Sequence, residues 1–161
     1  MQTIICMKWG SRYGAEFVNR LFSSIKIHAK RRTQLYCYTD DQFGINKEII
    51  CKPLPKINLP KDILLTPWRK ISIWQYPLGN LKGDILFLDL DLVITGNLDR
   101  FFDFKPGKYC VIENWTQIGK NIGNTSCFRF PAGKYDFVFN KFNKNPEKIW
   151  KKYHIEQIYL S

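Results

Sequence analysis

The spacing of hydrophobic residues along the chain predicts strands and helices in alternation. Two short, mostly apolar runs, residues 3–7 and residues 35–39, are typical of buried strands. Between them, apolar residues recur every three or four positions from Ala15 to Ile25, which indicates a helix with one buried face. A strand, a helix and a second strand in this order form a βαβ unit, whose strands are expected to pair in parallel through a right-handed crossover. The pattern therefore predicts an α/β fold.

The remaining elements are shorter, except for one strand. The strongest strand pattern of the chain covers residues 85–94, and a helix over residues 69–76 precedes it and ends at Pro77. Further strands are expected at residues 49–52, 108–113 and 127–130, a short helix at 97–102, and a helix over 137–153 that breaks at Asn145-Pro146. No linker or repeat divides residues 1–161, so one domain is expected.

Two carboxylates interrupt the strand predicted at residues 85–94. Alternation places Asp89 and Asp91 on one face of that strand, and both faces are otherwise apolar. Two unpaired like charges in an apolar interior are very costly. A divalent cation resolves the conflict, since Mg²⁺ and Mn²⁺ prefer oxygen ligands and complete their shell with substrate phosphates. The alternative is that both acids lie beyond the strand end, where they are solvated or cap a turn.

The charge of the chain favours anionic partners. The formal net charge is +11, and the basic residues are spread along the sequence, most densely at Lys30-Arg31-Arg32. No RNA-binding signature accompanies them, so a nucleic-acid partner is not expected. A solvated basic face and peripheral contact with an anionic membrane are the two interpretations that remain.

The cysteines and the hydropathy of the chain bear on its location. Five cysteines occur without a C-x-x-C pair, and their odd number argues against a disulfide framework. We therefore expect a reducing, cytoplasmic compartment, with possible work at the inner membrane face. No secretory signal pattern and no apolar run of about 18 residues are visible.

Several motifs resemble, in the same order, those of glycosyltransferases with the GT-A fold. The resemblance rests on these segments: Gly83–Ile94 with its D-x-D triplet, Met7–Gly10 with Tyr13-Gly14, Tyr38–Asp41, Trp68–Lys70, Asn124–Ser126 with Phe128–Phe130, and Glu156-Gln157. The most similar group is bacterial and related to glycogenin-like and lipopolysaccharide glycosyltransferases. D-x-D alone is a weak signal, whereas the ordered set extends through nearly the whole chain.

The resemblance implies a three-layer α/β/α domain with a mostly parallel mixed sheet. It also implies a nucleotide-sugar donor, a UDP-sugar in the first instance, that binds with Mn²⁺ or Mg²⁺. It assigns the metal to Asp91 and Asp89. The remaining donor-binding residues that it implies are Lys8, Trp9, Gly10, Tyr13, Asp40, Arg69, Lys70, Asp89 and Asn124. Glu156 and Gln157 would lie beside the anomeric carbon, in a transfer that retains configuration. The acceptor would be a hydroxyl of a surface glycan, a lipopolysaccharide or another lipid-linked sugar.

The chain also departs from that group. The related enzymes are longer and carry a late histidine or another ligand that completes the metal shell. Neither His28 nor His154 matches that ligand. We therefore expect a chain that lacks acceptor-side elements near its C-terminus.

Three alternatives follow from the same residues. A truncated, non-catalytic chain that binds a nucleotide sugar is the first. The second is a phosphatase of the haloacid-dehalogenase type, because its nucleophile motif also places D-x-D after a hydrophobic strand; that motif, however, normally lies on the first strand. A basic nucleic-acid module, the third, predicts strong salt-dependent binding to DNA or RNA.

Overall fold

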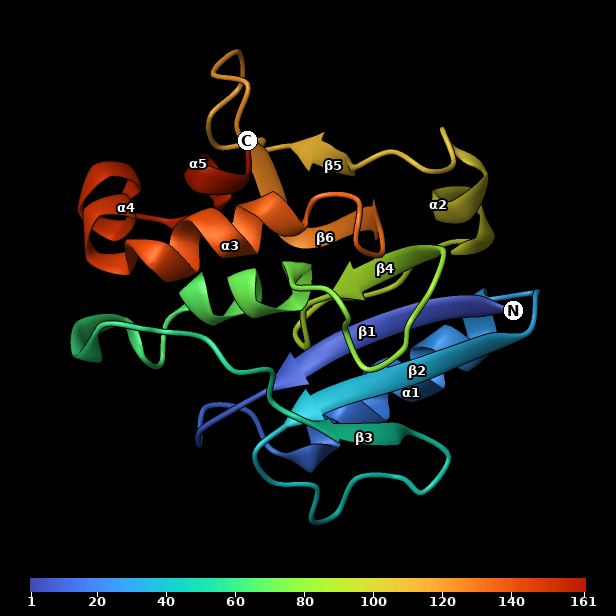
Figure 1. Ribbon diagram of the computed structural model, residues 1–161. Helices are drawn as coiled ribbons and strands as arrows, with labels where there is room; N and C mark the ends of the chain where they lie inside the picture. The colour runs from blue at the N-terminus through green and yellow to red at the C-terminus, as the bar shows by residue number, and fades with distance from the viewer.

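The computed structural model describes residues 1–161 and shows one six-stranded sheet with the order β3-β2-β1-β4-β6-β5 (Figure 1). The strands are β1 (Gln2–Lys8), β2 (Thr33–Thr39), β3 (Ile50–Pro53), β4 (Asp84–Leu88), β5 (Cys110–Glu113) and β6 (Gly123–Pro131). Strands β1 to β4 pair in parallel, and β6 pairs antiparallel with both β4 and β5. The predicted α/β fold with a mostly parallel mixed sheet is confirmed.

Helices cover both faces of the sheet (Figure 1). They are α1 (Ala15–His28), α2 (Asp99–Asp103), α3 (Asp136–Lys144), α4 (Pro146–Tyr153) and α5 (Glu156–Leu160), with 3₁₀ helices η1 (Lys61–Ile63) and η2 (Pro67–Trp74). One apolar core lies between α1 and one face of the sheet. A second core lies between the other face and the helices η2, α3, α4 and α5. Alternation along the strands divides the two cores, as in β1, where Ile4 and Ile5 belong to different ones.

Some predicted boundaries are wrong, each for a local reason. The segment predicted as a helix at residues 69–76 is the 3₁₀ helix η2, whose Trp74 stacks on Phe128 and Phe130 of β6. Strand β6 begins at Gly123, four residues before its predicted start. Residues 123–126 are glycine and polar residues, so no hydrophobic alternation indicates a strand there. The predicted break at Asn145-Pro146 is confirmed, because α3 ends at Lys144 and α4 begins at Pro146.

The largest correction concerns β4, which ends at Leu88 rather than at Ile94. The amide of Asp89 still donates to the carbonyl of Ser126 at 2.8 Å, and the chain then turns at Leu90 and Asp91. Leu90 is nevertheless buried in the core that faces α1. The alternation of apolar residues thus extends into the turn, although the backbone there no longer pairs with the sheet. For this reason the predicted strand was too long.

The carboxyl ends of β1, β2 and β4 share one edge of the sheet, on the left in Figure 1. In open α/β sheets this edge is where ligands bind. No helix of the structure combines the length and the apolar character needed to cross a membrane.

Candidate functional site

A cleft of about 490 Å³ opens at the carboxyl edge of the sheet. Three chain segments line it: the end of β1 with its following loop to Tyr13, the residues Leu65 to Lys70 around the start of η2, and Asp89 to Asp91 after β4. Six predicted site residues therefore line this cleft: Trp9, Gly10, Tyr13, Lys70, Asp89 and Asp91.

Asp89 and Asp91 occupy different environments, which corrects the prediction of two carboxylates on one strand face. Asp89 is largely buried, and its side chain is 23% exposed. Burial raises the pKa of its carboxyl, and the neighbouring ammonium of Lys70 opposes that rise. Asp91 is exposed in the turn at the mouth of the cleft. The buried carboxylate thus has a cation beside it, whereas the other carboxylate faces solvent.

Lys70 is the centre of a buried polar network. Its side chain is 5% exposed, and Nζ donates to Oδ2 of Asp89 at 2.9 Å and to the carbonyl oxygen of Thr125 at 3.1 Å. Nζ also lies 3.6 Å from Oε1 of Glu156, which is 8% exposed and accepts a 2.8 Å bond from the hydroxyl of Thr125. The ammonium lies 5.4 Å from the ring centroid of Phe87. Two acids from distant parts of the chain therefore share one buried cation.

The loop after β1 closes one side of the cleft. The amide of Gly10 donates to Oδ2 of Asp40 at 2.9 Å, and Gly10 itself adopts a φ of 63°, a left-handed conformation that favours glycine. The hydroxyl of Tyr13 donates to Oδ2 of Asp91 at 2.7 Å, and this bond to the carboxylate is the first cause of the raised pKa of Tyr13. Asp40 and Asp91 thus hold the two ends of this loop.

The other predicted donor residues lie outside the lining of the cleft. Lys8 is buried, and its Nζ donates to the carbonyl of Asp41 at 3.0 Å. Arg69 donates to the carbonyl of Leu64, and burial lowers the pKa of its guanidinium while Asp40 opposes that shift. Asn124 accepts a bond from the amide of Ser126 at 3.0 Å within its own strand. These three side chains support the loops and strands around the cleft.

Gln157 follows Glu156 at the start of α5, and its side chain is half-buried. Its side-chain amide makes no hydrogen bond within the protein, whereas its backbone carbonyl accepts one from the hydroxyl of Ser161 at 2.6 Å. The carboxylate of Glu156 is bound by Thr125 and Lys70, whereas the side-chain amide of Gln157 has no partner within the protein.

The sequence did not identify the contact partners of these residues. Thr125 was recognised only as part of a motif, and nothing in its neighbourhood along the chain indicates a bond to Glu156, which lies 31 residues later. The pairing of Lys70 with Asp89 crosses 19 residues. The available signal was a lysine close to Trp68 and Ile71 in a mostly apolar segment, because a lysine that is buried requires an acidic partner.

The geometry can be compared with proteins of known structure. The fold is shared with glycosyltransferases. The chain superposes on the glycosyltransferase GlyE of Streptococcus pneumoniae TIGR4 with a TM-score of 0.61 and 13% identity, over 98% of this chain and 41% of GlyE. It superposes on the galactosyltransferase LgtC, solved with donor and acceptor sugar analogues, with a TM-score of 0.67 and 12% identity, over 99% of this chain and 69% of LgtC.

The chain thus spans less than half the length of GlyE and about two thirds of LgtC. Neither a protein-family model nor a curated protein matches the sequence.

Proposed function

We propose that this chain is the donor-binding domain of a glycosyltransferase. It would transfer a hexose from a nucleotide sugar, a UDP-sugar in the first instance, to a hydroxyl of a surface glycan, a lipopolysaccharide or another lipid-linked acceptor. The observation that supports this best is the pair Asp89 and Asp91 at the edge of the cleft, at the carboxyl end of β4, in a fold shared with glycosyltransferases. The donor and acceptor analogues bound to LgtC are consistent with both substrate classes.

The residues of the cleft fit a divalent cation that shares its ligands with a substrate. No group of three or more His, Cys, Asp or Glu side chains could hold a metal by itself. Mg²⁺ and Mn²⁺ commonly take one or two carboxylates, several waters and substrate phosphates, and Asp91 and Asp89 provide the carboxylates. When bound, such an ion would stabilise the negative charge of the departing nucleoside diphosphate.

The chain's own residues would orient the donor. Trp9 and Tyr13 present aromatic surfaces to the cleft, and Gly10 allows the backbone to approach a ligand closely. Lys70 fixes Asp89, which lines the cleft, relative to Glu156, which does not line it. The free side-chain amide of Gln157 is available for a sugar hydroxyl next to Glu156. We assign this pair to the anomeric side of the donor and expect retention of configuration.

The first test is metal-dependent binding of UDP, measured by titration calorimetry with MnCl₂ and again with EDTA. The parent protein is expected to bind UDP only in the presence of the metal, and Asp91→Asn should lose that binding because the exposed carboxylate is removed. Asp62→Asn is the matched control, since Asp62 is exposed and makes no hydrogen bond or ion pair. Equal metal-dependent affinity in Asp91→Asn and the parent would falsify the assignment.

A second assay separates an enzyme from a chain that only binds its donor. Release of UDP from a panel of UDP-, GDP- and dTDP-sugars, measured with and without metal, identifies the donor and any hydrolysis. UDP binding without release from any sugar would support the non-catalytic alternative and leave the binding site in place.

A further inference from the structure

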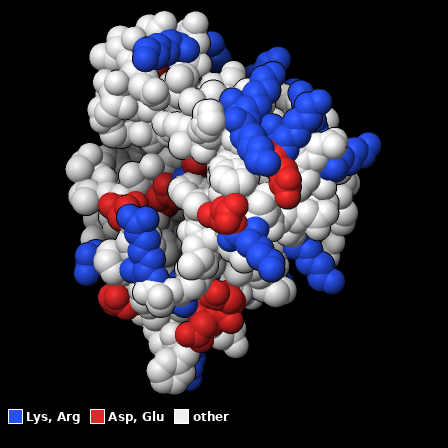
Figure 2. All heavy atoms as spheres, turned by 90° about the vertical axis from the view of Figure 1, so that its left-hand side faces the viewer, with Lys and Arg blue, Asp and Glu red and all other residues white.

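A cluster of lysines covers the solvent face of α3 and α4. Five lysines and one glutamate occur within residues 141–152, a net charge of +4 in a chain whose total is +11. The lysines are Lys141, Lys144, Lys148, Lys151 and Lys152, and all are exposed. Figure 2 shows Lys and Arg side chains gathered at the upper right of the face that carries α4 and the carboxyl edge of the sheet. We call this cluster the lysine face.

The charge of the lysine face is not neutralised within the protein. The only ion pair of the cluster joins Lys151 to Glu147 at 3.9 Å, and both side chains are about 70% exposed. Lys141, Lys144, Lys148 and Lys152 make no ion pair. Exposed like charges that repel one another are relieved by an external anionic partner.

The two helices that carry the lysines are fixed to the core. Phe142 of α3 is fully buried and stacks on Trp68 at 5.2 Å, and Ile149 of α4 is buried in the same core. The indole of Trp68 also donates to the carbonyl of His154, just after α4. The backbone that carries the lysines is thus already ordered before it meets a surface, so its ordering adds no entropy cost to binding.

Exposed apolar side chains lie on the same side of the molecule. Leu65 is 76% exposed, and Leu64 and Ile155 are each 41% exposed. Leu64 and Leu65 precede η2, whose Trp68 links this segment to the end of α4. Leu65 also lines the cleft. Lysines beside protruding leucines and an isoleucine match the interface of a lipid bilayer, where apolar tips enter the acyl boundary and cations meet anionic headgroups.

We infer that the lysine face, with Leu64, Leu65 and Ile155, docks the protein on an anionic phospholipid membrane. Docking would bring the mouth of the cleft to the lipid surface, because Leu65 belongs to both. If the proposed function holds, this orientation suits an acceptor sugar that is carried on a membrane lipid. The contact itself depends only on charge and exposed apolar surface.

The test is co-sedimentation of the whole chain with vesicles, without donor or metal. The protein is expected to bind vesicles of phosphatidylglycerol and phosphatidylcholine in equal parts, and not vesicles of phosphatidylcholine alone. Binding at about 0.1 M salt should weaken strongly at about 0.5 M, since screening shortens the range of the attraction. Failure to bind the anionic vesicles at low salt overturns the inference.

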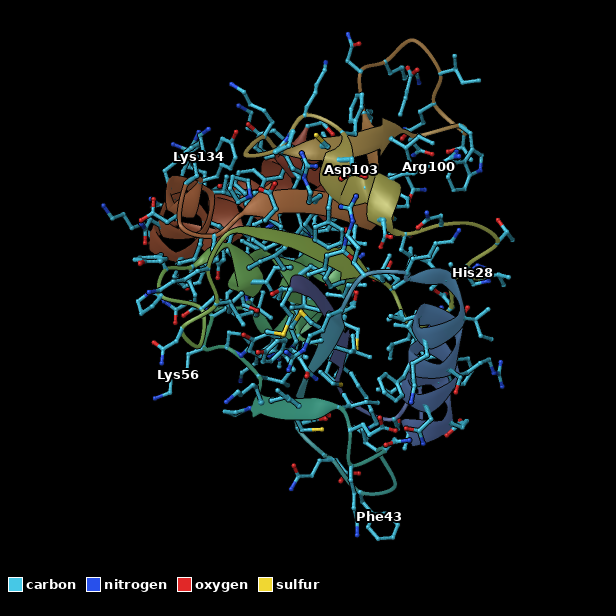
Figure 3. The ribbon with its side chains drawn as sticks, turned by 90° about the vertical axis from the view of Figure 1, so that its right-hand side faces the viewer. His28, Phe43, Lys56, Arg100, Asp103 and Lys134 are labelled. Atoms are coloured by element: carbon cyan, nitrogen blue, oxygen red, sulfur yellow. The ribbon has the colours of Figure 1, made fainter.

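Variants locate the contact on the surface. The triple variant Lys144→Gln, Lys148→Gln and Lys152→Gln should lower vesicle affinity by about tenfold or more. The matched control removes three charges at the opposite end of the molecule: Lys30→Gln, Arg32→Gln and Arg100→Gln. Figure 3 shows Arg100 on that opposite side, near His28 at the end of α1. An equal loss in both triple variants would mean that net charge alone drives binding, which contradicts a docking face.

A single change separates membrane insertion from electrostatic attraction. Leu64→Ser keeps every charge and should lower affinity for the anionic vesicles severalfold, because apolar area enters the interface. An unchanged affinity overturns the role of the leucine segment. Salt-sensitive binding to RNA with no binding to vesicles would assign the lysine face to a nucleic acid instead. Vesicle binding by a protein that fails to bind UDP would uphold the docking surface and reject the donor site.

Discussion

Lys70 carries its charge inside the protein, between one acid that directly follows β4 and one at the start of α5. Asp89 lies 2.9 Å from its Nζ and Glu156 lies 3.6 Å away. Breaking a buried ion pair by removing one partner is strongly destabilising, because the other charge remains buried without compensation. At the scale of single residues, removal of this ammonium is therefore expected to destabilise the protein strongly.

Lys70→Met should lower the free energy of unfolding by about 3–5 kcal/mol, because Asp89 and Glu156 lose their shared cation. Urea denaturation followed by circular dichroism measures the change. Lys120→Met is the matched control, since Lys120 is exposed and makes no ion pair. A loss no larger than that of the control would show that the pair is not buried in solution.

The sequence indicated several of the residues that line the cleft, but it did not indicate their contact partners. Asp89, Tyr13 and Lys70 were all predicted site residues, and they line one cleft. The bond from Tyr13 to Asp91 spans 78 residues, and only the folded chain brings these two groups together. Motif order indicates that residues belong to one site, but contact distance depends on how strands are placed beside one another.

Arg129 illustrates how one element fixes another. It lies on β6, is 1% exposed, and its guanidinium donates to the backbone carbonyls of a single segment that includes α2 and precedes β5. The carbonyls belong to Phe101, Phe102, Phe104, Lys105 and Lys108. Asp84 of β4 lies 3.7 Å from its Nε and accepts from the amide of Gly107. The segment 101–108 is thus held to the sheet through Arg129 and Asp84.

Arg129→Met should cost about 3–5 kcal/mol of unfolding free energy, since it leaves Asp84 without its cation and several buried carbonyls without a donor. Hydrogen exchange should show the first loss of protection in residues 101–110. Arg100→Met provides the control, because Arg100 is exposed and forms no ion pair. A uniform loss of protection across all strands would contradict the interpretation that Arg129 holds mainly the segment 101–108.

Element types were predicted more reliably than element ends. The βαβ unit of β1, α1 and β2 follows from hydrophobic period alone, because both strands and one helix face are buried. Strand β4 was overextended, since Leu90, Leu92 and Ile94 pack around the core that faces α1 after the strand has ended. A hydrophobic period reports burial, and burial continues into turns that cover a core.

At the scale of the whole molecule, the last helix completes the second core. Helix α5 brings Glu156 to Lys70 and Leu160 into the apolar cluster, and Tyr159 packs on Trp68 at 6.0 Å. The hydroxyl of Tyr159 also donates to the carbonyl of Val138 at 2.8 Å. Residues at the end of the chain are therefore tied to η2, α3 and β6.

A chain that ends at Ile155 should be less stable by about 3 kcal/mol or more, because Lys70 loses one acid and the core loses Leu160. The midpoint of urea unfolding measures the loss. A chain that lacks only Ser161 is the control. That residue donates one hydrogen bond and accepts one of 2.8 Å from Gly123, so the control should lose about 1 kcal/mol. Equal stability of the two shortened chains would show that α5 does not contribute to the core.

The sequence by itself determined the α/β class and the βαβ start of the chain, and it indicated half of the residues that line the cleft. These follow from local patterns, because hydrophobic spacing reports which residues are buried and motif order reports which loops reach the carboxyl edge of the sheet. The tertiary structure decided where β4 ends, that the ammonium of Lys70 lies beside the buried Asp89, and that Asp91 faces solvent. Those outcomes depend on contacts between residues distant in sequence, such as Lys70 with Glu156, and no local pattern records such a contact.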